Sequence, residues 1–95
     1  VPHEGLDFKA DIGTPVLATA DGVVASVGSR AGLGLVITLN HGKGFQTRYA
    51  HLGKARVAVG RRARRGEAIG LSGNSGLTKG PHLFYQVFKD GRPGD

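Results

Sequence analysis

Hydrophobic and polar residues alternate one by one along several short stretches of this 95-residue chain. Because successive side chains of a β-strand point to opposite faces of a sheet, each such stretch predicts a strand with one buried face. The clearest stretches are residues 35–40, 45–51 and 82–89, and shorter apolar stretches lie at residues 16–19, 23–27 and 67–71. No window shows a helical period. The pattern therefore predicts an all-β, mostly antiparallel fold with little or no helix.

Glycine-containing turns separate these stretches. Asp21-Gly22 lies between residues 16–19 and 23–27 and is typical of a two-residue hairpin turn, so these two segments are predicted to pair with each other. Residues 28–34 contain three glycines, which predicts a loop that turns sharply.

The last predicted strand begins at His82 and has two different faces. His82, Phe84 and Gln86 share one face, whereas Leu83, Tyr85 and Val87 share the other and are predicted to face the core. By the same alternation, His51 is predicted to lie on the same side of its strand as Tyr49. His3, Asp7 and His51 are the upstream residues that could meet His82 in a metal site.

Length and composition limit the number of domains and the residue types that could bind a metal. At 95 residues the chain is long enough for one domain, so residues 1–95 are predicted to form a single unit. The chain contains no cysteine, which leaves His, Asp and Glu as metal ligands. It has no apolar stretch long enough to span a membrane. Because it begins at Val1, we expect it to be part of a longer chain.

The net charge of +6 is unevenly distributed. Five of the thirteen basic residues are arginines in one short region, namely Arg56, Arg61, Arg62, Arg64 and Arg65. Such a cluster is typical of a solvated rim, and it also offers a surface to an anionic polymer, whether nucleic acid, an acidic glycan or a lipid surface. No aromatic residue lies between these arginines, which disfavours nucleic-acid binding.

Several short motifs occur in a fixed order along the chain. They are His3-x-Gly5-x-Asp7, Gly13-Thr14-Pro15-Val16, His41-Gly42-x-Gly44, Tyr49-Ala50-His51-Leu52 and Gly80-Pro81-His82-Leu83. Together, from His3 to about Arg92, they resemble the lysostaphin-type, or LytM-domain, family of zinc metalloendopeptidases, which cut peptide cross-links in bacterial cell walls. The resemblance implies a LytM-like β-sandwich or open barrel with a groove on one sheet.

The resemblance also implies roles for individual residues. His3 and Asp7 correspond to two zinc ligands of the family, and His51 and His82 correspond to histidines that assist catalysis. The position of the third ligand, the second histidine of an HLH motif, is occupied by Phe84. Gln86 occupies a position where the family often has an acidic residue.

Phe84 decides what we expect of the metal site. A catalytic zinc needs three protein donors and an open position for water, and a phenyl ring has no lone pair to donate. In a regular strand Tyr85 points to the other face and Gln86 lies about 7 Å further along. His82 could become the third ligand, but it would then be lost as an acid or base. We therefore predict an incomplete site that binds zinc weakly or not at all.

Three functions remain open from the sequence. The favoured one is a degenerate LytM-like module of the bacterial cell envelope, periplasmic or extracellular, that binds peptidoglycan or a partner protein without cleaving it. The alternative is an active zinc endopeptidase with a non-standard third ligand. The third is a binding or carrier module outside the envelope, although the chain lacks the exposed hairpin lysine that a carrier needs. Without a metal, His51 and His82 are expected to be buried polar groups, and His41 is expected to be structural.

Overall fold

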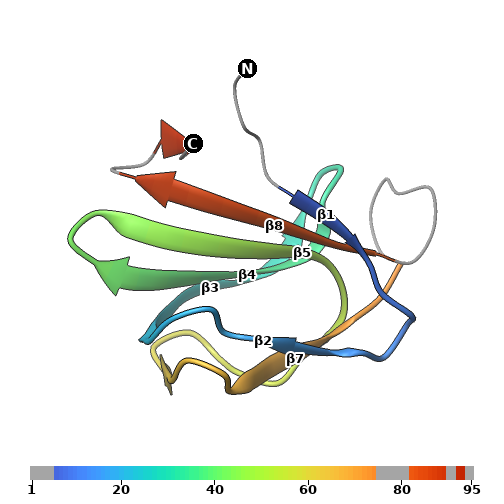
Figure 1. Ribbon diagram of the computed structural model, residues 1–95, viewed down its shortest axis with the longest axis horizontal. Helices are drawn as coiled ribbons and strands as arrows, with labels where there is room; N and C mark the ends of the chain where they lie inside the picture. The colour runs from blue at the N-terminus through green and yellow to red at the C-terminus, as the bar shows by residue number, and fades with distance from the viewer. Residues whose placement is uncertain (1–5, 75–81, 90–91, 94–95) are drawn as a thin grey trace.

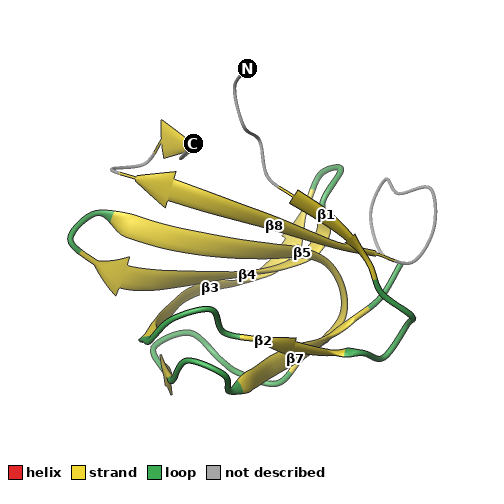
Figure 2. Cartoon of the chain, viewed as in Figure 1, coloured by secondary structure: helices red, strands yellow, loops and turns green. Residues whose placement is uncertain are grey.

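The computed structural model describes residues 6–74, 82–89 and 92–93, with the backbone alone at residues 6–8, 82 and 92–93. Every regular element in these ranges is a strand, as Figure 2 shows. The strands are β1 (Leu6–Lys9), β2 (Pro15–Leu17), β3 (Gly22–Arg30), β4 (Gly34–Gly42), β5 (Phe45–Ala55), β6 (Arg62–Ala63), β7 (Ala68–Ser72), β8 (His82–Lys89) and β9 (Arg92–Pro93). No described helix is long and apolar enough to cross a membrane.

The strands form one curled antiparallel sheet with the order β1-β8-β5-β4-β3-β6. β5 is central because its first part pairs with β4 and β8, whereas its end, near Ala55, pairs with β7. β7 in turn pairs with β2, and Figure 1 shows these two strands set apart from the broad layer of β3, β4, β5 and β8. The prediction of an all-β, mostly antiparallel fold is confirmed.

The core lies between the broad layer and the β2–β7 pair. Its buried side chains come from both parts: Ile37, Leu39 and Tyr49 from β4 and β5, and Val16 and Ile69 from β2 and β7. Burying these apolar side chains is the main favourable contribution to folding. The curl of the sheet therefore follows from the need to cover one face of β4 and β5.

The predicted hairpin at Asp21-Gly22 is wrong. β2 pairs with β7 rather than with β3, and β3 begins at Gly22, which lies opposite Ala63 of β6. The backbone of Ala18 is tied to the turn before β7, because its N–H donates to the carbonyl of Glu67 and its carbonyl accepts from Gly66. These long-range bonds satisfy the backbone groups that a local hairpin would have used.

The glycine-rich segment at residues 28–34 is shorter as a loop than predicted. β3 continues to Arg30 and β4 begins at Gly34, so only residues 31–33 form the turn. Gly32 and Gly34 have φ values of 78° and 68°, a conformation that glycine adopts at low cost.

Candidate functional site

Phe84 lies in the middle of the sheet, between β1 and β5. On one side its Cα is the register partner of Asp7, and on the other side it is the partner of Ala50. Asp7 and Phe84 are therefore backbone neighbours, although they are far apart in the sequence. His82, whose backbone begins β8, is opposite Lys9. His3 lies outside the described residues.

Phe84 and its strand neighbour Tyr85 are on different faces of the sheet. Tyr85 is the register partner of Tyr49, and the two ring centroids are 5.4 Å apart. Leu83 and Tyr85 pack against the core, which confirms the prediction for these two residues, whereas Val87 is exposed. We call the side opposite the Tyr49 ring the Phe84 face. Direct cross-strand partners share a face, so it carries Thr38, Arg48, Ala50, Phe84 and Gln86.

His51 turns toward Phe84, and the prediction that it shares a side with Tyr49 is wrong. β5 has one extra residue opposite β4 here, because Leu35 pairs with Leu52 but Ile37 pairs with Tyr49. His51 has φ 61°, as a bulge residue can. Its ring centroid lies 6.3 Å from that of Phe84, and only 5% of the residue is exposed. A buried imidazole and a phenyl ring thus stand beside each other.

Backbone contacts hold this bulge in place. The N–H of His51 donates to the carbonyl of Leu33 at 2.8 Å, and its carbonyl accepts from the N–H of Gly73 at 3.1 Å. Gly73 also lies so close to Gly53 that a Cβ at Gly73 would clash with the backbone nitrogen of Gly53. A glycine is therefore required at position 73, where the chain passes behind His51.

The described side chains include those of Phe84 and His51 but not those of His3, Asp7 and His82. No group of three or more His, Asp or Glu residues that could hold a metal ion occurs among them. At the position next to Asp7 in the register, the chain supplies a phenyl ring, which cannot donate to a metal. The assignment of His3 and Asp7 as ligands, and of His51 and His82 as catalytic residues, remains a prediction.

The Phe84 face also carries a positive charge that the sequence alone did not reveal. The guanidinium carbon of Arg48 lies 4.5 Å from the ring centroid of Phe88, and its Nη1 donates to Oε1 of Gln86 at 3.4 Å. Burial lowers the pKa of Arg48, and the nearby charge of Arg30 lowers it further. In the sequence Arg48 is simply one polar position of an alternating strand, so only its surroundings identify it.

His41 is structural, as predicted. Its Nδ1 lies 2.7 Å from the carbonyl oxygen of Asp21, and its Nε2 lies 2.6 Å from Oγ1 of Thr47. Both ring nitrogens therefore have partners that join β4 to its neighbours.

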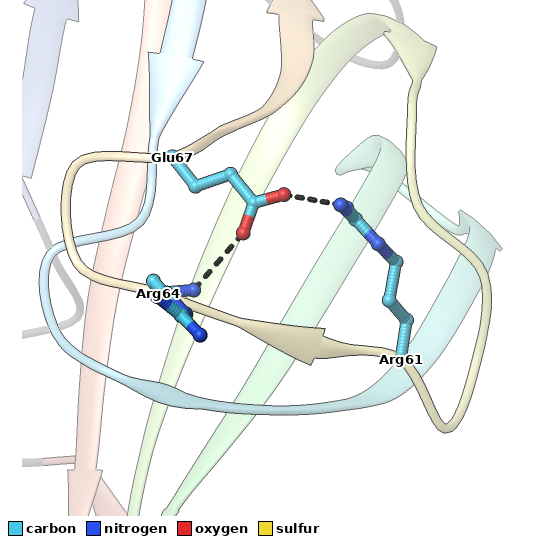
Figure 3. Close-up of polar contacts among 3 residues, drawn as sticks. All are labelled: Arg61, Arg64 and Glu67. Atoms are coloured by element: carbon cyan, nitrogen blue, oxygen red, sulfur yellow. Dashed lines mark hydrogen bonds and ion pairs between the residues drawn. The ribbon is translucent and has the colours of Figure 1, made fainter.

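The arginine cluster lies on an exposed rim around β6. Figure 3 shows that Glu67 bridges two of its members: one carboxylate oxygen accepts from the Arg61 side chain, and the other accepts from the backbone N–H of Arg64 at 3.1 Å. All five arginines of the cluster are exposed. Their contact with an anionic polymer remains a prediction.

Comparison with known proteins gives consistent matches along the chain. The model of peptidase family M23 matches residues 1–95. Peptidoglycan DD-endopeptidase ShyA of Vibrio cholerae is 46% identical over 92 residues, which cover 97% of this chain and 21% of ShyA. The chain thus spans about a fifth of the curated relatives it matches.

Two solved structures extend this similarity to the fold. A zinc containing peptidase from Vibrio cholerae superposes with a TM-score of 0.94 at 41% identity, over 100% of this chain and 29% of that one. The catalytic domain of lysostaphin from Staphylococcus simulans superposes with a TM-score of 0.91 at 36% identity, over 98% of this chain and 74% of that one.

Proposed function

Because the chain belongs to peptidase family M23, we propose that it is a non-catalytic member, which binds peptidoglycan or a partner protein in the bacterial cell envelope and so regulates wall remodelling or assembly. The observation that carries the proposal is the place of Phe84. The residue is the register partner of Asp7, and its ring centroid lies 6.3 Å from that of His51.

The chemistry of these residues supports a loss of catalysis. A site built on His3 and Asp7 has two of the three donors that a catalytic zinc needs, and the third position offers only carbon atoms. Removing a residue that hydrogen-bonds to a metal ligand already lowers metal affinity about 10-fold to 100-fold. Removing a ligand itself therefore lowers the affinity further. Without a metal to activate water, His51 and His82 have no nucleophile to deprotonate.

The matches support peptidoglycan as the binding partner. ShyA is named a peptidoglycan DD-endopeptidase, and its match covers nearly all of this chain. On the same grounds we propose that residues 1–95 form one LytM-like domain of a longer envelope protein, either periplasmic or extracellular. The exposed arginines around β6 are available to an anionic polymer of the wall.

Metal content and cleavage test the proposal directly. The purified chain is expected to bind isolated peptidoglycan, to contain far less than one zinc per chain by mass spectrometry, and to release no fragments from cross-linked peptidoglycan. Stoichiometric zinc together with cleavage would overturn the proposal, and would establish instead an active endopeptidase with a non-standard third ligand.

The variant Phe84→His tests whether the missing donor at this position is the reason for weak zinc binding. An imidazole at this position is expected to raise zinc affinity by more than about 100-fold, because it completes a three-donor set. The measurement is calorimetric titration with zinc. Val87→His adds the same side chain to β8 on the other face, and it is the matched control, expected to leave zinc affinity unchanged. If both variants bind zinc equally, Phe84 does not occupy a ligand position.

A further inference from the structure

A row of polar residues crosses the Phe84 face next to Phe84 itself. Thr38 on β4, Arg48 on β5 and Gln86 on β8 are direct cross-strand partners. This row is two residues along the strands from the row of Ala50 and Phe84, or about 7 Å at about 3.3 Å per residue. A ligand that lies over Phe84 therefore also reaches Arg48.

Arg48 carries a charge that the described residues do not neutralise. Its polar partner is the neutral amide of Gln86, at a long 3.4 Å, and the Phe88 ring lies against the guanidinium. The carboxylate ion pair found in the described part of the chain is that of Glu67 with Arg61 on the distant rim. Arg30 adds a second positive charge near Arg48 rather than a counterion. A partly buried cation in such surroundings is costly until an anion approaches it.

Two buried polar atoms in the same row also lack hydrogen-bond partners in the described part of the chain. Within the described residues, neither Oγ1 of Thr38 nor Nε of Arg48 makes a hydrogen bond. Thr38 is only 5% exposed. Buried polar atoms are nearly always satisfied in folded proteins, and leaving one unsatisfied costs free energy. Two such atoms in neighbouring strands indicate that this row is completed by something that the described residues do not supply.

The hydrogen-bond donors in this row favour a carboxylate as the ligand. A guanidinium is a planar group whose N–H donors match the two oxygens of a carboxylate. Because the Gln86 oxygen already accepts from Arg48, its amide nitrogen remains available as a further donor. Phe84 and Phe88 flank Gln86 at two residues on either side along β8, so apolar groups next to the carboxylate would find aromatic surface.

We propose that Thr38, Arg48 and Gln86 form a carboxylate-binding subsite beside Phe84, and that its ligand is a free carboxylate of a peptidoglycan stem peptide. The identity of this ligand rests on the proposed function. A stem peptide presents isolated carboxylates next to small apolar side chains. The carboxylate would bind Arg48, and the apolar groups would contact the rings of Phe84 and Phe88. An acidic segment of a partner protein is the rival ligand.

Calorimetric titration with defined stem pentapeptides tests the subsite. Each free carboxylate is amidated in turn, and amidation of at least one of them is expected to weaken binding about tenfold, because a charge-assisted bidentate contact is lost. Arg48→Gln is expected to weaken binding of the unmodified peptide by the same factor and to abolish the effect of that amidation. Arg48→Lys keeps the positive charge but cannot donate two parallel hydrogen bonds to one carboxylate, so it is expected to bind with intermediate affinity.

Lys54→Gln is the matched control, since it removes an exposed positive charge at the end of β5 that pairs with β7 rather than with β8. It is expected to bind the pentapeptides as the unaltered chain does. Thermal melts of all the variants show whether each one is folded. Unchanged binding by folded Arg48→Gln, or equal binding of every amidated peptide, would overturn the subsite.

The results that would contradict the subsite differ from the results that would contradict the proposed function. If Arg48→Gln still binds whole peptidoglycan and the pentapeptides as the unaltered chain does, only the subsite is wrong. If the unaltered chain cleaves peptidoglycan with bound zinc but retains the carboxylate preference, only the non-catalytic role is wrong. If a glutamate-rich peptide binds through Arg48 and the stem pentapeptides do not bind, the proposed ligand is wrong.

Discussion

Tyr49 joins several hydroxyl groups beneath the sheet, on the core side of the site. Its hydroxyl lies 2.9 Å from Oγ1 of Thr47, 3.0 Å from Oγ1 of Thr19 and 3.1 Å from the backbone nitrogen of Thr19. The residue is only 1% exposed. Tyr85 is its partner across the strands, and among the described residues its hydroxyl contacts Oγ1 of Thr19 at 3.1 Å, near the surface. The two tyrosines therefore differ in how many buried groups depend on them.

Tyr49→Phe is expected to lower the free energy of unfolding by about 1–3 kcal/mol, because it leaves buried donors and acceptors without a partner. Tyr85→Phe, the matched control, removes the same atom where water can replace it, and is expected to cost about 1 kcal/mol or less. Urea denaturation measures both changes. Equal losses would show that the Tyr49 hydroxyl is not the centre of this network.

At the scale of elements, the position of His51 depends on two segments that cross behind it. Gly53 of β5 and Gly73 after β7 approach so closely that a side chain on Gly73 would meet the Gly53 backbone. The same segment supplies the N–H that bonds the carbonyl of His51. The bulge on β5 and the end of β7 therefore form one packed unit, which turns the imidazole toward Phe84.

Gly73→Ala is expected to separate these segments, since its Cβ would lie 2.5 Å from the Gly53 Cα. Overpacking against backbone costs about 1–3 kcal/mol of stability. We also expect the ring resonances of His51 to shift in nuclear magnetic resonance spectra. Gly28→Ala is the control, because a Cβ there meets nothing within 4 Å. If Gly73→Ala is as stable as Gly28→Ala, the close approach does not constrain the bulge.

At the scale of the whole molecule, the turn at residues 64–67 connects the rim to the layer of β2 and β7. Glu67 accepts from Arg64 and Arg61, and the backbone N–H of Arg65 donates to the Asp21 carboxylate at 2.7 Å. The hydrogen bond from the Arg64 backbone, followed by the contact with Arg61, lowers the pKa of Glu67 from its ordinary value of 4.5. The folded state therefore favours the ionised carboxylate.

The lowered pKa of Glu67 makes the stability of the folded chain depend on pH in the acid range. The contribution of Glu67 is fully present above pH 4.5, the ordinary value, and is lost as the pH falls through the lower pKa of the folded state. Glu67→Gln is therefore expected to lose less stability than the unaltered chain when thermal melts are compared at pH 7 and at successively lower pH values below 4.5.

Asp11→Asn is the control for this comparison, because the Asp11 side chain is exposed and makes no hydrogen bond within the described residues. It is expected to keep the acid dependence of the unaltered chain. An acid dependence that is the same in Glu67→Gln as in the unaltered chain would show that the contacts of Glu67 do not stabilise the fold.

The sequence by itself determined the fold class, the family and the central question about the site. Alternation with a period of two is a local property, and it predicted the strands that became β4, β5 and β8 because one face of each is covered. The order of motifs indicated the family to which the chain belongs. The absence of a donor at Phe84 also follows from side-chain chemistry alone.

Only the tertiary structure decided which strands pair and which way His51 points. Asp21-Gly22 is a good hairpin turn in isolation, but Val16 and Ala18 are buried when β2 pairs with β7 instead, and long-range burial outweighs a local turn preference. The bulge at His51 needs backbone partners at Leu33 and Gly73, which are distant in sequence. Among the described residues, the cross-strand partners of Arg48 are the neutral residues Thr38 and Gln86, and only the pairing of β4, β5 and β8 brings the three together.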